Sequence, residues 1–367
     1  MPFRNRLPFP IVLTPMKLAI FGLTVSSSWG NGHATLWRGL IRALAARGVH
    51  IDFFERDVSY YAHNRDLTHL PGGGTLHLYD DWADIAATAR AAVLAADATI
   101  VTSYCPDAIP AARLMEDAPG QTIFYDLDTP VTLARLGAGE TVAYLPAHGL
   151  EQFDLVLSYT GGRALEGLRQ LGARRVAPLY GHVDPQAHAP ARPEPRYGAD
   201  LSYIGTWAAD RQPAVDALFI APARALPDQR FVLAGSGYPS DFPWTRNIWF
   251  VRHLPPAEHP AFYAASRLTL NVTRADMKAY GWCPSGRLFE AAACGAPILT
   301  DTWEGLDSFF TPGKELLTAE TTDQALQALA RDDLPEIARR ARARALAEHT
   351  SAHRADELLA LLERVPA

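Results

Sequence analysis

Hydrophobic runs that alternate with amphipathic stretches predict a chain built from β-loop-α-β units. From Met16, an apolar run at 17–23 leads into a polar loop of small residues and then into a stretch with apolar residues three and four positions apart. This spacing indicates a helix with one buried face, Gly48 is a suitable C-terminal stop, and the run at 49–54 is typical of a buried strand. The helical stripe consists of Leu36, Trp37, Leu40, Ile41, Leu44 and Ala45.

The same alternation continues through both halves of the chain. Further strands are predicted at 98–102, 121–125, 155–159, 200–204, 230–234, 248–252, 268–272 and 297–300. Further helices are predicted at 91–96, 163–171, 212–225, 285–294, 325–329, 336–348 and 356–362. Strands that alternate with helices favour parallel sheets covered on both faces, so the predicted fold class is α/β.

A change in composition divides the chain into two predicted domains. Three prolines fall between positions 190 and 195, and proline-rich segments form stiff, exposed connectors. We therefore expect an N-terminal domain at 16–185 and a C-terminal domain at 186–351, preceded by a flexible extension at 1–15.

The overall composition excludes several classes of protein. The 367 residues are 48% hydrophobic and 20% charged, which argues against global disorder, collagen and coiled coils. The net charge of −6 does not favour nucleic acid as a partner, because phosphate backbones attract clustered positive charge. No apolar run is long enough for a transmembrane segment, and three scattered cysteines fit neither a disulfide framework nor a zinc site of paired thiolates. We therefore expect a cytoplasmic protein.

The first loop of the chain has an anion-binding pattern. Gly30, Asn31 and Gly32 precede a predicted helix start at His33, where free backbone amides and the helix dipole favour a negative charge. A tight turn without a ligand explains the same residues. Thr35 occupies the position of the third glycine of G-x-G-x-x-G, which weakens the case for a dinucleotide-binding dehydrogenase.

A stronger signal lies in the second half. Ser285 is a good N-cap for the predicted helix, so the backbone amides of Ser285, Gly286 and Arg287 are expected to face a ligand at the helix start. Glu290, near the second turn, has two carboxylate oxygens that can accept hydrogen bonds from both hydroxyls of a ribose. The alternative role of Glu290 is an i, i+3 ion pair with Arg287.

These motifs resemble those of a known family. The segment 289–298 resembles the signature of retaining, group 1 glycosyltransferases of the GT-B fold, and segments 22–34, 271–274 and 284–290 resemble its CgeB-like, spore-maturation branch. The similarity spans nearly all of residues 16–357. It implies two Rossmann-like domains whose parallel sheets face each other across a cleft. It also implies an acceptor bound mainly to the first domain, a nucleoside-diphosphate sugar bound mainly to the second, and a C-terminal helix, at about 352–367, that packs back on the first domain. The apolar stripe of that helix, Ala355, Leu358, Leu359 and Leu362, is also consistent with packing on the second domain.

One position departs from the family pattern. Trp282 stands eight residues before Glu290, where the wider family has a second glutamate. The departure affects how the hydroxyls of the donor sugar are held, and with it the stereochemical outcome. We expect retention of configuration.

The departing diphosphate needs cations to stabilise its charge, and the sequence offers several. Arg211 follows a glycine-containing turn, and Arg274 and Lys278 follow a predicted strand, so each could neutralise the leaving group without a metal. A solvated surface charge is the commoner role of such side chains. His253 lies where relatives contact the base, and a structural role is equally compatible. The expected donor-binding residues are Gly30, Asn31, Gly32, Gly205, Thr206, Arg211, His253, Arg274, Lys278, Ser285, Gly286, Arg287 and Glu290.

Activation of the acceptor points to His33 or Asp128. A histidine can orient a hydroxyl or take its proton near neutral pH, and Asp128 follows a predicted strand on the acceptor side. Asp126 and Asp128 also form a D-x-D, which allows a manganese-dependent GT-A transferase or a phosphatase with an aspartyl nucleophile, although both need more than two aspartates. The expected catalytic residues are His33, Asp128, Arg274 and Lys278.

Together these features predict an enzyme that transfers a hexosyl or related sugar from a nucleoside-diphosphate sugar to a small-molecule, glycan or protein acceptor. No cofactor or metal is expected. The alternatives are a nucleotide-sugar epimerase of the same two-domain shape and a non-catalytic protein that binds sugar nucleotides.

Overall fold

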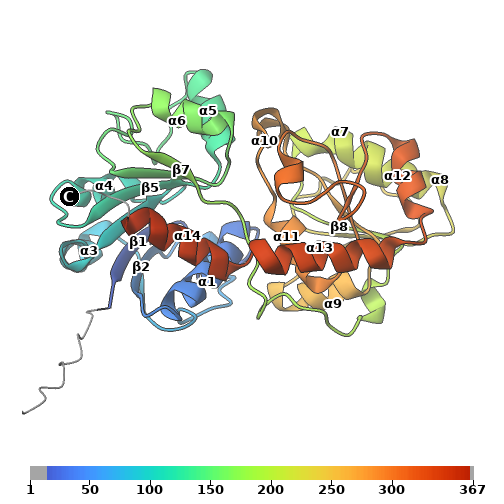
Figure 1. The fold of residues 1–367 in the computed structure, drawn as a ribbon, viewed down its shortest axis with the longest axis horizontal. Helices are drawn as coiled ribbons and strands as arrows, with labels where there is room; N and C mark the ends of the chain where they lie inside the picture. Colours follow the sequence, from blue (N-terminus) through green and yellow to red (C-terminus); the bar gives the residue numbers. More distant parts are fainter. Residues whose placement is uncertain (1–14, 364–367) are drawn as a thin grey trace, which may run out of the picture.

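The computed structural model describes residues 15–363, which form two α/β domains side by side (Figure 1). The expected flexible extension lies outside the described residues except for Pro15, and so do residues 364–367. Each domain contains one parallel sheet with helices on both faces, because buried apolar strands need cover on both sides. The predicted α/β class is confirmed.

The N-terminal sheet has seven parallel strands in the order β3-β2-β1-β4-β5-β6-β7. Its central strands are buried along nearly their whole length, as their unbroken apolar runs predict. The strands are β1 (Lys17–Gly22), β2 (His50–Arg56), β3 (Thr75–Tyr79), β4 (Ala98–Thr102), β5 (Gln121–Asp126), β6 (Leu155–Ser158) and β7 (Val176–Pro178). The helices of this part of the chain are α1 (Gly32–Ala45), α2 (Ser59–Ala62), α3 (Trp82–Ala95), α4 (Ala108–Met115), α5 (Thr129–Gly137) and α6 (Arg163–Gln170).

The C-terminal sheet has six strands in the order β10-β9-β8-β11-β12-β13. The strands are β8 (Leu201–Ile204), β9 (Phe231–Ala234), β10 (Ile248–Val251), β11 (Thr269–Asn271), β12 (Ile298–Thr300) and β13 (Leu317–Thr318). The helices are α7 (Gln212–Val215), α8 (Ala221–Ala225), α9 (His259–Ala264), α10 (Ala275–Tyr280), α11 (Gly286–Cys294), α12 (Thr322–Leu329), α13 (Leu334–Glu348) and α14 (Ser351–Glu363). A π-helical turn at Asp216–Ile220 joins α7 to α8, so the helix predicted at 212–225 is continuous but widened in its middle. Short 3-10 turns occur at Pro195–Tyr197, Ala209–Arg211, Pro256–Glu258 and Leu306–Ser308.

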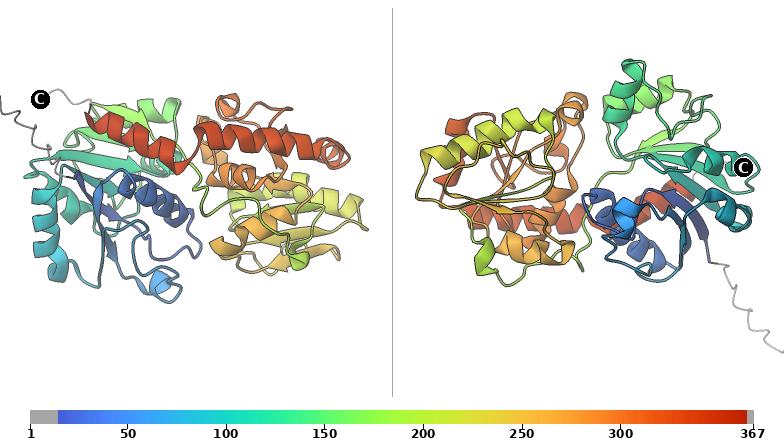
Figure 2. Two further views of the ribbon diagram at one scale, coloured as in Figure 1. Left: turned by 60° about the horizontal axis from the view of Figure 1, so that its bottom comes forward. Right: turned by 180° about the vertical axis from the view of Figure 1, so that it is seen from behind.

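The chain crosses between the domains twice, and the two crossings pair with each other. The backbone N–H of Val183 donates to the carbonyl of His349 (3.0 Å), and the N–H of Ser351 donates to the carbonyl of Val183 (2.8 Å). After the second crossing, α14 packs on α1 of the N-terminal domain, whereas α13 lies on the C-terminal domain (Figure 2). Arg47 at the end of α1 forms a bidentate ion pair with Asp356 of α14. The last helix therefore completes the first domain.

Within residues 15–363, no helix combines the length and the apolar character needed to cross a bilayer.

Candidate functional site

A cavity of about 490 Å³ separates the two domains at the carboxyl ends of both sets of strands. Open α/β sheets bind ligands at this edge. The N-terminal wall includes Tyr104, Asp128 and Tyr159, which follow β4, β5 and β6. The C-terminal wall is formed by the loops after β8 and β11 and by the start of α11. An adjoining space of about 90 Å³ extends past Gly235, Ser236 and His253.

The loop before α1 is fixed by a carboxylate that sequence analysis did not single out. Glu55, at the end of β2, is buried and accepts hydrogen bonds from the backbone N–H of Val25 (2.7 Å) and from the N–H (3.0 Å) and hydroxyl (2.5 Å) of Ser26. In dinucleotide-binding domains an acid near this place binds the ribose of the cofactor. Here the Glu55 carboxylate is already hydrogen-bonded to the loop before α1 and is not free to bind a ribose. Together with Thr35 in the position of the third glycine, this argues against a dinucleotide-binding dehydrogenase.

Asn31 caps helix α1, which begins at Gly32, one residue before the predicted start. Its Oδ1 accepts a hydrogen bond from the backbone N–H of His33 (3.0 Å). Gly30, Asn31 and Gly32 line both cavities, so the predicted anion-binding loop does face the cleft.

The start of α11 has the predicted geometry. The Oγ of Ser285 accepts a hydrogen bond from the backbone N–H of Arg287 (3.3 Å), and Gly295 ends the helix in the left-handed conformation. Ser285, Gly286 and Arg287 line the cavity together with Gly205 and Thr206 from the loop after β8. The positive end of the helix dipole is therefore directed at the cavity.

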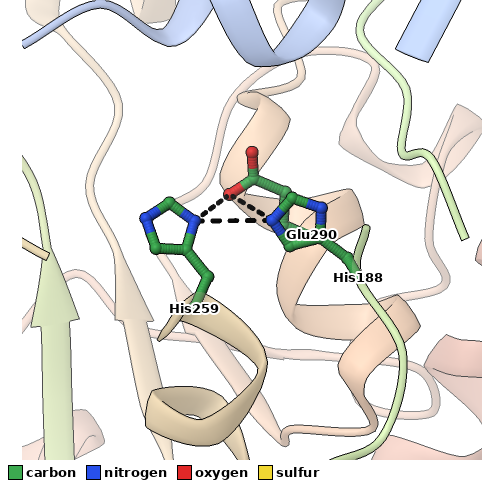
Figure 3. Close-up of side chains that lie close together, drawn as sticks. All are labelled: His188, His259 and Glu290. Atoms are coloured by element: carbon green, nitrogen blue, oxygen red, sulfur yellow. Dashed lines mark hydrogen bonds and ion pairs between the residues drawn. The ribbon is translucent and has the colours of Figure 1, made fainter. Parts of the chain in front are cut away.

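Glu290 lies at the cavity wall and forms the i, i+3 ion pair with Arg287, while its binding to a ribose stays a prediction. Glu290 is 6% exposed, and the Nη1 of Arg287 donates to its Oε2 at 2.5 Å. Figure 3 shows that this same oxygen faces the imidazoles of His259 (Nδ1, 3.6 Å) and His188 (Nε2, 3.9 Å), while the other oxygen points away from both rings. Burial alone would raise the pKa of Glu290, but Arg287, His188 and His259 together outweigh burial and hold the pKa well below its ordinary value.

The cluster of His188, His259 and Glu290 has the composition of a metal site. Its three ligand atoms lie 3.4–3.9 Å apart, close to the ~3.3–3.4 Å edges of a tetrahedron with zinc bonds of about 2.0–2.1 Å. Burial lowers the pKa of both histidines, that of His259 to about 4, so both rings are neutral at pH 7. However, the Arg287 Nη1 lies 3.1 Å from the His259 Nδ1 as well as 2.5 Å from Glu290. A guanidinium already contacts two of the three ligand atoms, so we assign no metal to the cluster.

The structure brings two of the three predicted cations, Arg211 and Arg274, to the cavity wall. Arg211 and Arg274 line the cavity; the Arg211 Nη1 donates to the carbonyl of Thr206 (3.2 Å), and Arg274 pairs with Asp210 (3.3 Å). Lys278 is not brought to the cavity wall. Its Nζ lies 2.9 Å from Glu320 and 3.6 Å from Asp301, and these two carboxylates bind the ammonium group.

His253 reaches the smaller cavity and touches the opposite domain. Its imidazole packs on the indole of Trp29, with the ring centroids 4.2 Å apart and the ring planes tilted by 38°. Trp29 comes from the loop before α1, so this pair bridges the two domains. The sequence pattern gave no indication of Trp29, because its partner lies far away in the chain.

His33, Asp128 and Tyr104 lie together on the N-terminal wall. The His33 Nε2 is 3.9 Å from the Asp128 Oδ2, and the Nδ1 of His33 is buried without a partner. Burial lowers the pKa of His33, and the nearby Asp128 offsets only part of this effect. Tyr104 has a positive φ of 63°, a strained conformation for a bulky residue, and strain of this kind concentrates at functional sites. Sequence analysis did not single out Tyr104.

The two aspartates of the D-x-D point to different surroundings. Asp126 is fully buried, its Oδ1 accepts the backbone N–H of Asp128 (3.1 Å), and burial raises its pKa to about 6. Asp128 lines the cavity, whereas Asp126 does not. The pair therefore does not present two carboxylates to one metal or substrate, which argues against the GT-A and phosphatase alternatives.

Trp282, the departure from the family pattern, is a contact between the domains. It has a positive φ of 41°, and its carbonyl accepts the backbone N–H of Gly161 from the N-terminal domain (2.9 Å). Its ring lies on Gly162, where a Cβ atom would be 2.4 Å from the ring. The side chain is absent from the cavity wall, so it does not replace a sugar-binding glutamate there.

Comparison with known proteins supports the architecture. Residues 211–360, less than half of the chain, match a family described as glycosyl transferase-like. No curated protein matches the chain. Among solved structures, sucrose-phosphate synthase from Thermosynechococcus elongatus has a TM-score of 0.66 and 16% identity over 95% of this chain and 98% of its own. Anabaena Alr3699/HepE in complex with UDP-glucose has a TM-score of 0.68 and 13% identity, over 95% of this chain and 100% of its own.

A third similar structure is alpha-glucosyltransferase (AGT) in complex with UDP, with a TM-score of 0.67 and 10% identity over 95% of this chain and 100% of its own. At such low identities these likenesses establish the fold. The chain has the GT-B fold, with two Rossmann-like domains that face each other across a cleft, as the sequence predicts.

Proposed function

We propose that this protein is a glycosyltransferase that moves a sugar from a nucleoside-diphosphate sugar to an acceptor hydroxyl. The observation that carries the proposal is the interdomain cavity, whose two walls differ in chemistry. The C-terminal wall presents Arg211, Arg274 and the α11 N-terminus, which suit a diphosphate, and the N-terminal wall presents His33 beside Asp128. The match of residues 211–360 to a glycosyl transferase-like family supports the same function.

The donor is assigned to the C-terminal wall. We place the diphosphate at the backbone amides of Ser285 and Gly286, and the base in the smaller cavity beside His253. Glu290 is the candidate partner of the ribose hydroxyls, with Arg287 fixing the orientation of its carboxylate. Anabaena Alr3699/HepE, which has the same fold, is seen with UDP-glucose, and this supports a nucleotide-sugar donor.

The chemistry breaks the bond between the anomeric carbon and the diphosphate oxygen and forms a bond from that carbon to the acceptor oxygen. Negative charge grows on the leaving diphosphate, where Arg211 and Arg274 can stabilise it, so we propose that no metal is required. The acceptor proton passes to neutral His33, and Asp128 stabilises the resulting imidazolium. Lys278 has no direct role in this proposal because Glu320 and Asp301 bind it.

Two stereochemical outcomes have support. The resemblance to retaining enzymes supports retention, which we propose. Inversion is the second candidate, because the His33–Asp128 pair, which takes the acceptor proton in the proposed reaction, would serve a direct displacement equally well. The anomeric proton coupling of the first product, measured by NMR before mutarotation, distinguishes the two.

We also propose a cytosolic location. The cysteines Cys105, Cys283 and Cys294 are free and buried, and free thiols are typical of reducing compartments. Fractionation of the native host cells tests this assignment.

A panel of radiolabelled UDP-, GDP- and dTDP-sugars tests the function. We expect slow release of one nucleoside diphosphate in the absence of an acceptor, faster release when an acceptor is added, and loss of both in Arg274→Ala. Binding without turnover would instead indicate a non-catalytic sugar-nucleotide binder. Release of an epimerised nucleotide sugar would indicate an epimerase, although such an enzyme needs several carboxylates around one sugar, and here one of the two at the cavity, Glu290, is tied to Arg287.

A further inference from the structure

We infer that the acceptor is an uncharged sugar, and that sugar phosphates are excluded from the N-terminal wall of the cavity. This inference rests on the proposed function and deepens it by naming the class of acceptor. It is carried by the charges of that wall, by the state of its polar atoms and by its aromatic surface.

The N-terminal wall offers no cation for a phosphate. Among the described residues that line it there is no lysine or arginine, and its charged member is the carboxylate of Asp128. Its two imidazoles are neutral at pH 7, because burial lowers the pKa of His33 and brings that of His182 to about 4. A phosphate bound here would face like charge and would lose its hydration without gaining a cationic partner.

The nearby arginines of the same domain are already paired. Two of them hold the loop before α1, where Arg38 donates to the carbonyl of Val25 and Arg65 donates to the hydroxyl of Ser26. The third arginine, Arg56, is the last residue of β2. The three ion pairs are Arg38–Asp66 (2.5 Å), Arg65–Asp57 (2.5 Å) and Arg56–Asp107 (3.0 Å). A swing of any of these guanidinium groups toward an acceptor would leave an aspartate unpaired. The opposite wall differs because Arg211 and Arg274 line the cavity itself, although Arg274 is also paired with Asp210.

Residues of the wall also carry neutral polar atoms that are buried beneath its surface and lack partners. Asn31 is only 8% exposed, and its Nδ2, a hydrogen-bond donor, is buried without a partner. The Nδ1 atoms of His33 and His182 are buried and unpartnered as well. The Nε2 of His182 lies 3.1 Å from the carbonyl of Leu36, so this nitrogen is already engaged by the backbone. Buried polar atoms normally have partners, and ligand hydroxyls that reach these atoms after a local side-chain movement would supply them.

Aromatic side chains give the wall a surface for a sugar ring. Tyr61, Tyr104 and Tyr159 line the cavity, and rings of this kind pack against the apolar faces of ligands while their hydroxyls bond to polar groups. Burial raises the pKa of Tyr104 and of Tyr159, so both phenols remain protonated donors. A neutral ring with several hydroxyls satisfies the donors, the acceptors and the aromatic surface at once.

The test compares matched acceptors with the enzyme and its active labelled donor. Each neutral monosaccharide of a panel, such as glucose, galactose, mannose and fructose, is paired with its 6-phosphate, and transfer and the rate of donor hydrolysis are both measured. We expect transfer to at least one neutral sugar, with kcat/KM reduced by more than about 100-fold for its phosphate, as like-charge contacts dictate. Equal or better use of a phosphate would overturn the inference, and so would a lack of both transfer and binding for every neutral sugar.

Two variants separate the charge of the wall from its other functions. In Asp128→Asn we expect the preference for the neutral sugar over its phosphate to fall by about 10-fold or more, whereas His33→Gln, the matched control, should lower both rates and leave the ratio unchanged. Circular dichroism and a thermal melt confirm that each variant still folds. An unchanged ratio in Asp128→Asn overturns the inference. If no nucleotide sugar is hydrolysed or transferred under any condition, the proposed function fails; if only phosphates are used, the function stands and the acceptor class is wrong.

Discussion

Replacement of Glu290 by glutamine tests the central pair of the C-terminal domain. The change keeps the shape of the side chain and removes its charge, leaving Arg287 beside the neutral His259 and His188. Loss of one partner from a buried ion pair costs about 3–5 kcal/mol. Because the Arg287 side chain is 32% exposed, solvent screens part of this cost, and we expect about 2–3 kcal/mol. At about 2–4 °C per kcal/mol for a domain of this size, the melting temperature should fall by about 4–12 °C.

The pH dependence of this loss has a definite sign. The pKa of Glu290 is lowered in the folded protein, so its stabilisation is present above the ordinary glutamate value of 4.5 and is lost as pH falls through the folded-state pKa. The difference between wild type and Glu290→Gln should therefore be largest near pH 7 and shrink in acid. Urea unfolding at several pH values measures it. The double variant Arg287→Met, Glu290→Gln should lose less than the sum of the single variants.

Nucleotide binding by the same variants separates the two roles of Glu290. If its carboxylate accepts hydrogen bonds from a ribose, Glu290→Gln should weaken binding of the preferred nucleoside diphosphate by about 1–3 kcal/mol in calorimetry. Unchanged affinity for UDP, GDP and dTDP, together with the loss of stability, would reduce Glu290 to a structural partner of Arg287. A stability change under about 0.5 kcal/mol with additive single effects would refute the reasoning from the buried pair.

Four further predictions follow from the cavity and its surroundings. Arg274→Ala should lower kcat by about 100-fold, more than it raises KM, because charge grows in the transition state; an effect confined to KM would make Arg274 an anchor for the ground state. Activity should persist in EDTA, and a loss that manganese restores would contradict the assignment of the leaving group to arginines. Because burial lowers the pKa of His33, the acid limb of the kcat/KM profile should lie below pH 6.5 and disappear in His33→Gln, and a limb above pH 6.5 would count against His33 as the base. Burial raises the pKa of Asp126 from 3.8 to about 6, so the free energy of unfolding falls as pH rises between these values. In urea unfolding, Asp126→Asn should therefore be more stable than wild type by up to about 3 kcal/mol at pH 8 and by little at pH 4. Equal effects at both pH values would argue against a raised pKa.

Features that depend on neighbours in the chain were accessible from the sequence. The start of α11 could be placed because Ser285 and Gly295 mark the ends of a helix by local chemistry, and the structure has both caps. The central strands β4 and β5 were found from their apolar runs, with β5 one residue longer than predicted. Strand β3 escaped notice because it lies at the sheet edge and is largely half-buried, so its sequence has no unbroken apolar run.

Features that depend on distant partners were not accessible. Glu55 becomes important because the fold brings it to the loop at residues 24–26, and Trp29 because it packs on His253 across the cleft. His188 meets Glu290 although about a hundred positions separate them in the sequence. Lys278 shows the converse case: its place after β11 suggested the cavity wall, but the structure pairs its ammonium group with Glu320 and Asp301 from other segments, so a role in catalysis stays a prediction.

The return of α14 to the first domain sets the order in which the protein can be completed on the ribosome. Strands β1–β7 emerge first, yet the surface of α1 that receives α14 stays uncovered until α14 itself leaves the exit tunnel. By then the whole second domain has been synthesised and can already have folded. The domain that begins synthesis first is therefore the last to acquire all of its native contacts, and premature termination before Ser351 would release a protein with an intact second lobe and an unfinished first one.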